Sequence, residues 1–387
     1  MASTYLTRTF QSGGNRKKWT MSYWLKRDVL GSSNIMFQTY VSDYTWCRFD
    51  TNNKFQFQDG GGGNHVSTRV FVDTSAWYHF VVAIDTDNST ASDRYKIYVN
   101  GERITAFDTN SNPSQGYEGN WNKNVLMNIG RHSAGSDYFS GLMSHIHFCD
   151  GYEYQPSDFG ETDATTGEWK IKTSPSVNYG TTGFFILKDG NSGTDQSGNS
   201  NNWTANGNLT NTKDCPSNAF ATLSPSILPR NSGGSISNGA LTFGTSAAQW
   251  TTESSAFGIT NGKYYFEVKL RDNGSDRRFR WGLQKNTEIT KTGNNKVIGG
   301  SDNNAIGYAT QGESATQGSY FINQSSTNLT DGVINENNAI YGYAIDLDNQ
   351  RMYGHFNGTW LHSGNPSAGT GGIDVSSFYT VGEPLFP

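Results

Sequence analysis

One pattern occurs twice in this sequence, about 260 residues apart, and it constrains the fold more than any other feature. Each copy is an apolar stretch ending in Ala-Ile-Asp-x-Asp-Asn, followed by a second stretch ending in Asn-Gly; the copies span 80–101 and 343–358. Asp and Asn tolerate the left-handed conformations of a turn, and Asn-Gly supplies the positive φ angles of a tight hairpin. Each copy therefore predicts two antiparallel strands, and together they predict two all-β domains of related design.

The composition agrees with an all-β chain. The 387 residues are enough for two or three domains, and 13% aromatic residues suit cores built between sheets. Charged residues make up only 16% of the chain and glycine numbers 45, as expected where strands are short and turns are many. Short apolar runs at this density predict two antiparallel β-sandwich (jelly-roll) domains in tandem.

The runs also divide the chain. Strand signals follow one another from the N-terminus to about residue 205, which predicts a first sandwich over 1–205. Residues 206–238 contain prolines and glycines with little periodicity, so we interpret them as a linker. A second run of strand signals predicts another sandwich over 239–387.

Charge and cysteine content exclude several classes of function. The net charge of −5 gives no overall attraction to nucleic acid or to an anionic membrane, so we expect neither partner. No apolar run approaches the length of a membrane span, and the N-terminus lacks the pattern of a signal peptide. The three cysteines include no C-x-x-C pair, which favours synthesis in a reducing cytoplasm over a disulfide framework.

Several segments resemble known families of antiparallel sandwiches. Residues 77–85, 98–101, 128–130 and 139–143 resemble a laminin-G-like, concanavalin-A-like jelly roll. Residues 262–268, 280–283, 306–308, 342–346 and 357–360 resemble a SPRY (B30.2-like) domain. SPRY domains usually continue past a segment like 385–387 into a closing strand, so the second sandwich is expected to lack its last strand or to borrow one from a partner.

The order of the two domains adds to this resemblance. Residues 5–10, 149–152 with 156–160, 195–203 and 214–223 are similar to structural proteins of marine tailed bacteriophages, in which a laminin-G-like domain precedes a SPRY-like one. The resemblance implies a virion surface protein made in the host cytoplasm. Its expected partners are other capsid or tail proteins, further copies of itself and host-surface polysaccharide.

Glycan recognition requires an aromatic face to stack on a sugar ring, beside polar groups that bond its hydroxyls. The loop at 117–122 has both parts and makes Trp121 the first candidate, with Tyr117 beside it. Similar groupings occur at three other places, and they add the candidates Trp46, Asp137, Tyr138 and Trp360. Packing in a core is the alternative role for each aromatic residue.

Calcium is the one cofactor that the resemblance implies, because laminin-G-like domains often bind it at the rim. Asp85, Asp87 and Asp195 offer hard oxygen ligands in predicted turns. The competing interpretation is that these residues only form the turns.

Enzymatic chemistry finds little support in the sequence. The nearest acid pair for a glycosidase is Glu161 with Asp163, and the third acid, Glu168, is spaced too far along the chain to share a strand face with them. His145 and His147 alternate on one predicted strand, but nothing in the sequence brings a third metal ligand to them. We therefore expect a non-enzymatic protein that attaches to host glycans; the alternatives are a capsid or tail decoration protein and a polysaccharide-degrading enzyme.

Overall fold

The computed structural model describes residues 4–10, 13–39, 43–164, 167–188, 192–224, 234–245, 252–255, 258–271, 279–285, 304–310, 318–323, 325–332, 334 and 336–387. The chain divides into two compact units. The first comprises residues 1–222 and 237–242, and the second comprises 223–236 and 243–387. Part of the predicted linker, 206–222, thus belongs to the first unit, whereas 225–233 lie outside the described residues.

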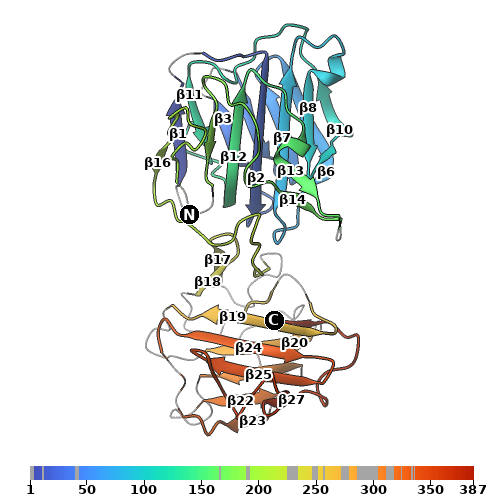
Figure 1. Cartoon of the computed structure of the whole chain (residues 1–387), viewed down its shortest axis with the longest axis vertical. Coiled ribbons are helices and arrows are strands. Elements are labelled where there is room, and N and C mark those ends of the chain that lie inside the picture. The colour runs from blue at the N-terminus through green and yellow to red at the C-terminus, as the bar shows by residue number, and fades with distance from the viewer. Residues whose placement is uncertain are drawn as a thin grey trace. The chain divides into compact units, whose positions relative to one another are not determined.

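The first unit is a sandwich of two antiparallel sheets (Figure 1). The larger sheet has eight strands, in the spatial order β10 (Phe107–Ser111), β6 (Gly63–Val70), β5 (Lys54–Asp59), β4 (Thr45–Phe49), β3 (Asn34–Thr39), β11 (Leu126–Ile129), β1 (Tyr5–Thr9) and β16 (Thr204–Asn206). The smaller has six, in the order β15 (Phe184–Ile186), β12 (Gly141–Asp150), β2 (Lys18–Arg27), β7 (Tyr78–Asp85), β8 (Tyr95–Val99) and β9 (Glu102–Arg103). The expected jelly-roll sandwich is therefore confirmed for this unit.

The core of the first unit lies between the two sheets and is mainly aromatic. Trp19, Phe57 and Trp121 meet there with ring centroids 5.8 to 6.2 Å apart, within the range of favourable aromatic pairs. These side chains reach the core because every second residue of a strand faces the opposite sheet.

A short covering layer packs on the outer face of the six-stranded sheet. It contains helix α1 (Pro156–Phe159) and the hairpin of β13 (Gly160–Thr162) and β14 (Trp169–Ile171). Phe159 from this layer joins Val81, Ala83, Tyr98 and Cys149 in a second buried cluster. The outer face of the six-stranded sheet is therefore partly covered.

The second unit also contains two antiparallel sheets. One has the order β19 (Lys263–Lys269), β24 (Ile340–Asp346), β25 (Arg351–Phe356) and β26 (Thr359–Trp360), with β27 (Ile373–Asp374) paired to β25. The other has the order β23 (Ser325–Asn328), β22 (Ser319–Ile322), β21 (Ala305–Ala309), β20 (Arg280–Lys285) and β28 (Leu385–Phe386). Elsewhere, β17 (Gly234–Ser237) pairs with β18 (Thr242–Thr245), and a 3₁₀ turn occupies Ala91–Asp93.

Both copies of the repeated pattern form the predicted hairpins. Strand β7 pairs with β8, and β24 pairs with β25, each in antiparallel register. The Asn-Gly turns adopt positive φ angles at both positions, 49° and 85° at Asn100 and Gly101, and 49° and 84° at Asn357 and Gly358. Turn chemistry alone was thus sufficient to predict these local structures.

No helix in the described ranges is long and apolar enough to span a membrane.

Candidate carbohydrate-binding face

The outer face of the eight-stranded sheet carries the most distinctive arrangement of polar groups in the described structure. Along β4, Cys47 and Phe49 point into the core, so Trp46 and Arg48 point outward. Trp46, one of the candidates for sugar stacking, lies within this strand, directly between Gln38 of β3 and Gln58 of β5. Trp46 therefore occupies the middle of a sheet face.

The register of the sheet extends this line to every one of its strands. Residues that pair directly across antiparallel strands share one face. Continuing from Trp46 in both directions gives an unbroken row on the outer face, which we call the polar row: Ser111, Asn64, Gln58, Trp46, Gln38, Asn128, Thr7 and Thr204. With strands about 4.8 Å apart, the row is roughly 34 Å long.

Obligate donors fix the orientation of the amide side chains on this face. The backbone N–H of Ser133 donates to Gln38 Oε1 at 2.5 Å, and Arg131 Nε donates to Asn128 Oδ1 at 3.3 Å. These donors cannot accept a hydrogen bond, so each amide must turn its oxygen toward them. The amide nitrogens of Gln38 and Asn128 are then left to face other partners.

The same reasoning applies to the other half of the row. Arg48 Nε donates to Gln56 Oε1 at 2.7 Å, which leaves the Gln56 amide nitrogen as a donor. That nitrogen donates to Asn64 Oδ1 at 2.9 Å and to Gln58 Oε1 at 3.3 Å. The amide oxygens of the row are therefore all engaged within the protein.

Two donors on the row are buried without a partner. Trp46 Nε1 and Asn128 Nδ2 are both enclosed, and neither donates to any described residue. Trp46 is 7% exposed and Asn128 fully buried. A buried donor without an acceptor costs free energy, about 1–3 kcal/mol, so an acceptor oxygen that reached either atom would be stabilising.

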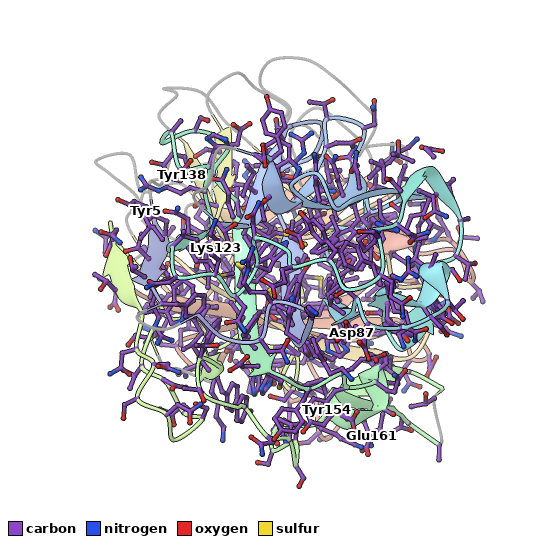
Figure 2. The ribbon with its side chains drawn as sticks, turned by 90° about the horizontal axis from the view of Figure 1, so that it is seen from above. Tyr5, Asp87, Lys123, Tyr138, Tyr154 and Glu161 are labelled. Carbon is purple, nitrogen blue, oxygen red and sulfur yellow. The ribbon has the colours of Figure 1, made fainter. Side chains whose placement is uncertain are left out.

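Aromatic rings and guanidinium groups border the row. Arg131 lies 3.5 Å from the ring centroid of Tyr5, and Tyr5 packs 6.3 Å from Tyr138. Figure 2 shows Tyr5 and Tyr138 on one side of the molecule and Tyr154 and Glu161 on the opposite side. At the centre of the row, Arg48 lies 4.4 Å over the ring of Trp46.

The first candidate for sugar stacking, Trp121, is a core residue. It is fully buried and stacks on Phe57, so its indole presents no face to a ligand. The prediction of an exposed Trp121 is wrong because the polar loop around it folds into the sandwich. Asp59 holds that loop by accepting the backbone N–H of Asn120 at 2.7 Å.

The remaining glycan candidates lie in separate places. Tyr117 is half-buried, and its hydroxyl donates to the backbone oxygen of Asp59. Asp137 and Tyr138 lie beside β3, where Ile35 donates its N–H to Asp137 O at 3.0 Å. Trp360 belongs to the second unit and packs edge-on against His355. Of these four, Tyr138 borders the polar row through its contact with Tyr5.

The three candidate calcium ligands each have contacts within the protein. Asp85 pairs with Lys18 at 2.7 Å, and Asp87 pairs with Lys17 at 3.5 Å. The Asp195 oxygens accept four hydrogen bonds, three from the backbone N–H groups of residues 185, 197 and 201 and one from the Ser197 hydroxyl. Among the described residues, no group of three His, Cys, Asp or Glu side chains could hold a metal ion. The arrangement favours turn formation as the role of these carboxylates.

The acidic candidates for chemistry are also engaged internally, as is the buried imidazole of His79. Lys170 lies 3.4 Å from Glu161 and 3.3 Å from Asp163. His79 accepts a hydrogen bond from Trp169 Nε1 on its Nδ1 atom, so its Nε2 carries the proton and faces Ser22 Oγ at 2.8 Å. Burial lowers the pKa of His79 to about 3. A neutral imidazole protonated at Nε2 cannot take the serine proton, so this pair is not a nucleophile and base.

His145 and His147 lie close together on β12, with ring centroids 6.4 Å apart, although a bulge interrupts the strand between Ser144 and His147. His147 Nδ1 bonds the hydroxyl of Tyr179 at 2.8 Å, and burial lowers the pKa of His147 well below its usual range. These contacts indicate a packing role.

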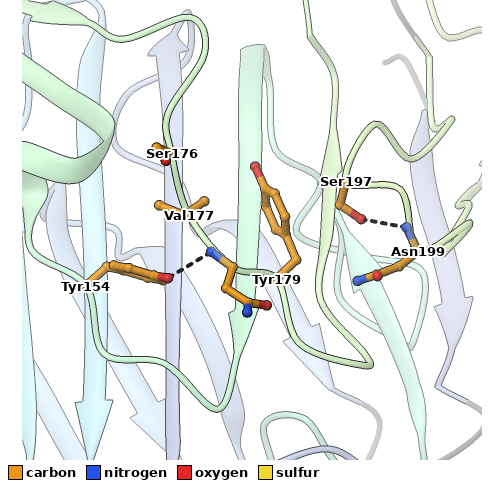
Figure 3. Close-up of a pocket in the computed structure, with 7 residues that line it drawn as sticks. Tyr154, Ser176, Val177, Tyr179, Ser197 and Asn199 are labelled. Atoms are coloured by element: carbon orange, nitrogen blue, oxygen red, sulfur yellow. Dashed lines mark hydrogen bonds between the residues drawn. The ribbon is translucent and has the colours of Figure 1, made fainter.

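A shallow hollow of about 520 Å³ lies near the covering layer (Figure 3). It is lined by Tyr154, Ser176, Val177, Asn178, Tyr179, Ser197 and Asn199. Tyr154 and Ser197 accept the backbone N–H groups of Asn178 and Asn199 in this hollow, as the dashed lines in Figure 3 show. Because internal partners already occupy its polar groups, the hollow is a weaker candidate than the polar row.

Comparison with known proteins agrees with the architecture of the first unit. Residues 2–152 match the family described as the concanavalin A-like lectin/glucanases superfamily. No protein of curated function matches the chain in sequence.

Among solved structures, the chain is similar to a Bacteroides ovatus protein proposed to bind carbohydrate, with 20% identity and a TM-score of 0.36 over 56% of this chain and 60% of that one. It is also similar to a heptameric pentraxin from Limulus polyphemus, with 15% identity and a TM-score of 0.30 over 40% of this chain and 72% of that one. Domains LG4-5 of the mouse laminin α1 chain share 9% identity with a TM-score of 0.30, over 99% of this chain and 78% of that one. These likenesses are distant, whereas the family match and the sheet topology together give the first unit a concanavalin-A-like jelly-roll fold.

Proposed function

We propose that the chain is a non-enzymatic carbohydrate-binding protein and that its first unit binds glycans on the outer face of the eight-stranded sheet. The observation that carries this proposal is the polar row, with its two buried and unpartnered donors Trp46 Nε1 and Asn128 Nδ2. Sugar hydroxyl and ring oxygens are suitable acceptors, and nearby aromatic rings suit the apolar faces of sugars. The lectin-like fold of this unit supports the same conclusion.

The test is a glycan array probed with the purified chain and with a Trp46→Phe variant. Phenylalanine keeps an aromatic ring at the centre of the row but has no N–H donor. We expect binding by the natural chain and a loss of roughly tenfold or more in affinity for the variant, the effect of about one hydrogen bond. Binding to no glycan at all, or equal binding by both proteins, would contradict the assignment.

We further propose that the protein acts on the surface of a bacteriophage particle, where many copies contact host polysaccharide together. The support is the resemblance of the two-domain order to phage structural proteins, including a SPRY-like second unit. Weak single contacts gain strength when later contacts become intramolecular on one particle. Antibody labelling of intact particles tests this role, since absence of the chain from particles would exclude it.

A second candidate function, decoration of the capsid or tail, is favoured by the exposed strand β19. Within the described residues, β19 forms one end of its sheet, and Tyr264, Tyr265 and Val268 are 36%, 53% and 42% exposed. An exposed edge strand is a ready template for pairing with a strand of another protein. If decoration is the main role, Val268→Lys should prevent incorporation into particles, whereas Trp46→Phe should not.

A further inference from the structure

The polar row has more free hydrogen-bond donors than free acceptors. Internal donors occupy the amide oxygens of Gln38, Gln58, Asn64 and Asn128, as described above. No described residue accepts a hydrogen bond from the amide nitrogens of these four side chains. The indole N–H of Trp46 can only donate. The half-buried amides of Gln58 and Asn64 therefore present donors and few free acceptors to a ligand, whereas Gln38, Trp46 and Asn128 are at most 7% exposed.

Two guanidinium groups add further donors to this face. Arg48 and Arg131 each use their Nε atom on an amide oxygen, and Arg48 Nη1 also donates to Ser33 Oγ at 3.4 Å, which leaves the remaining N–H groups of the terminal nitrogens as further donors. In the described structure, neither arginine has a carboxylate within ion-pair distance. Asp50 and Asp137 act on Arg48 only through longer-range attraction. In the described part of the chain, both guanidinium groups are thus without a close ion pair, although two carboxylates lie near enough to attract Arg48.

A neutral sugar hydroxyl both donates and accepts, so a neutral glycan would bring donors that find few acceptors along the row. A carboxylate or sulfate group only accepts when it is ionised, and hydrogen bonds to charged groups are roughly twice as strong as neutral ones. Planar guanidinium groups also match the oxygens of such anions in pairs. The acceptor groups of an acidic polysaccharide therefore complement the donors of this face.

We propose that the ligand of this face is an acidic polysaccharide whose chain lies across the strands, along the polar row. This proposal rests on the carbohydrate-binding function proposed above and adds the chemical class and direction of the ligand. Carboxylate or sulfate oxygens accept hydrogen bonds from the half-buried amide nitrogens of Gln58 and Asn64 and from the two arginines. Tyr44, which is 63% exposed and whose ring centroid lies 4.6 Å from that of Trp46, places an exposed aromatic ring beside the row.

Two nearly isosteric substitutions test the donor array. Gln58→Glu and Asn64→Asp each keep the oxygen that accepts from Gln56, but they replace a donor nitrogen with a charged oxygen. The matched control is Gln196→Glu, the same chemical change at an exposed side chain that makes no hydrogen bond in the described structure. Thermal unfolding of each variant verifies that it is folded before binding is measured.

The probes are immobilised polygalacturonate, dextran sulfate and neutral dextran, with the full chain in solution. We expect binding to at least one acidic polymer, a loss of roughly 10- to 100-fold in affinity for both test variants, and no comparable loss for the control. Binding should also weaken between 0.1 and 1 M salt, where the screening length falls from about 10 Å to about 3 Å. The polymer preferred in this comparison distinguishes carboxylate from sulfate.

Three alternative results distinguish failure of the acidic ligand class, of the site and of the proposed function. Equal binding to dextran and to the acidic polymers overturns the acidic class while leaving carbohydrate binding intact, as does binding only to neutral glycans on the array. Binding to acidic polymers that Gln58→Glu weakens no more than Gln196→Glu does removes the polar row as the site. Binding to no glycan on the array and to none of the polymers defeats the proposed function itself.

Discussion

Asp59 connects the stability of the first unit to pH in an unusual direction. Its carboxylate is 1% exposed and accepts hydrogen bonds from Tyr95 Oη at 2.9 Å and from the backbone N–H of Asn120 at 2.7 Å. These bonds favour the ionised form, but burial outweighs them and raises the pKa of Asp59 to about 6 from its ordinary value of 3.8. The folded protein therefore binds a proton at a pH where the unfolded chain does not.

The sign and size of the effect follow from proton linkage. For a raised pKa, the favourable contribution is present below pH 4 and is lost as the pH rises from about 4 to 6. A difference of about two pH units corresponds to about 3 kcal/mol in the free energy of unfolding. Asp59→Asn has no charge to bury, and its amide can accept from Asn120 and donate to the Tyr95 oxygen.

The assay is urea unfolding of both proteins from pH 4 to pH 7.5, followed by tryptophan fluorescence. Relative to the natural chain, we expect Asp59→Asn to gain about 3 kcal/mol in unfolding free energy across this range. Only the difference in unfolding free energy between the two proteins is informative, because His79 affects both in the opposite direction. Its lowered pKa makes acid destabilising below pH 6.5. The control Glu102→Gln changes an exposed carboxylate and should give a flat difference. A flat difference for Asp59→Asn as well would refute the reasoning.

Three other substitutions test the fold. Trp121→Ala should lower the unfolding free energy by about 3–5 kcal/mol in urea because it empties a fully buried site, while leaving glycan affinity unchanged in the folded variant. Lys26→Met should cost about 3–5 kcal/mol by calorimetry, since it leaves Asp214 charged and buried without its partner 2.9 Å away, and a double variant with Asp214→Leu should recover part of the loss. Gly101→Ala should destabilise by more than 1 kcal/mol on chemical unfolding, because φ is 85° and a Cβ atom would lie 2.7 Å from the Trp169 ring; an unchanged midpoint would contradict the rigid turn.

Local turn chemistry explains which parts of the fold could be predicted from sequence. The strand pairs β7–β8 and β24–β25 and the Asn-Gly turns that follow them depend only on neighbouring residues, and both copies were predicted correctly. The prediction for Trp121 was wrong because its polar neighbours indicated exposure. Its environment depends on Asp59, some 60 positions earlier in the chain, which holds the loop around it. Contacts across such a separation have no signature in a single sequence.

The polar row could not have been predicted for a related reason. Its eight members come from eight strands spread between Thr7 and Thr204, and they align only when every register is known. A slip of one residue in any strand would turn that member into the core. The sequence showed Trp46 as one aromatic candidate among several, but the amide residues on either side of it carried no recognisable motif.

The buried ion pair of Lys26 and Asp214 has a consequence for dividing the chain experimentally. Asp214 also accepts hydrogen bonds from Trp77 Nε1 and the backbone N–H of Phe220, so the segment around it is part of the first sandwich. A fragment cut at residue 205, where the strand signals pause, would leave a buried ammonium group without its counter-ion. Expression of the first unit alone therefore calls for an end point no earlier than residue 222, the last position of its continuous segment.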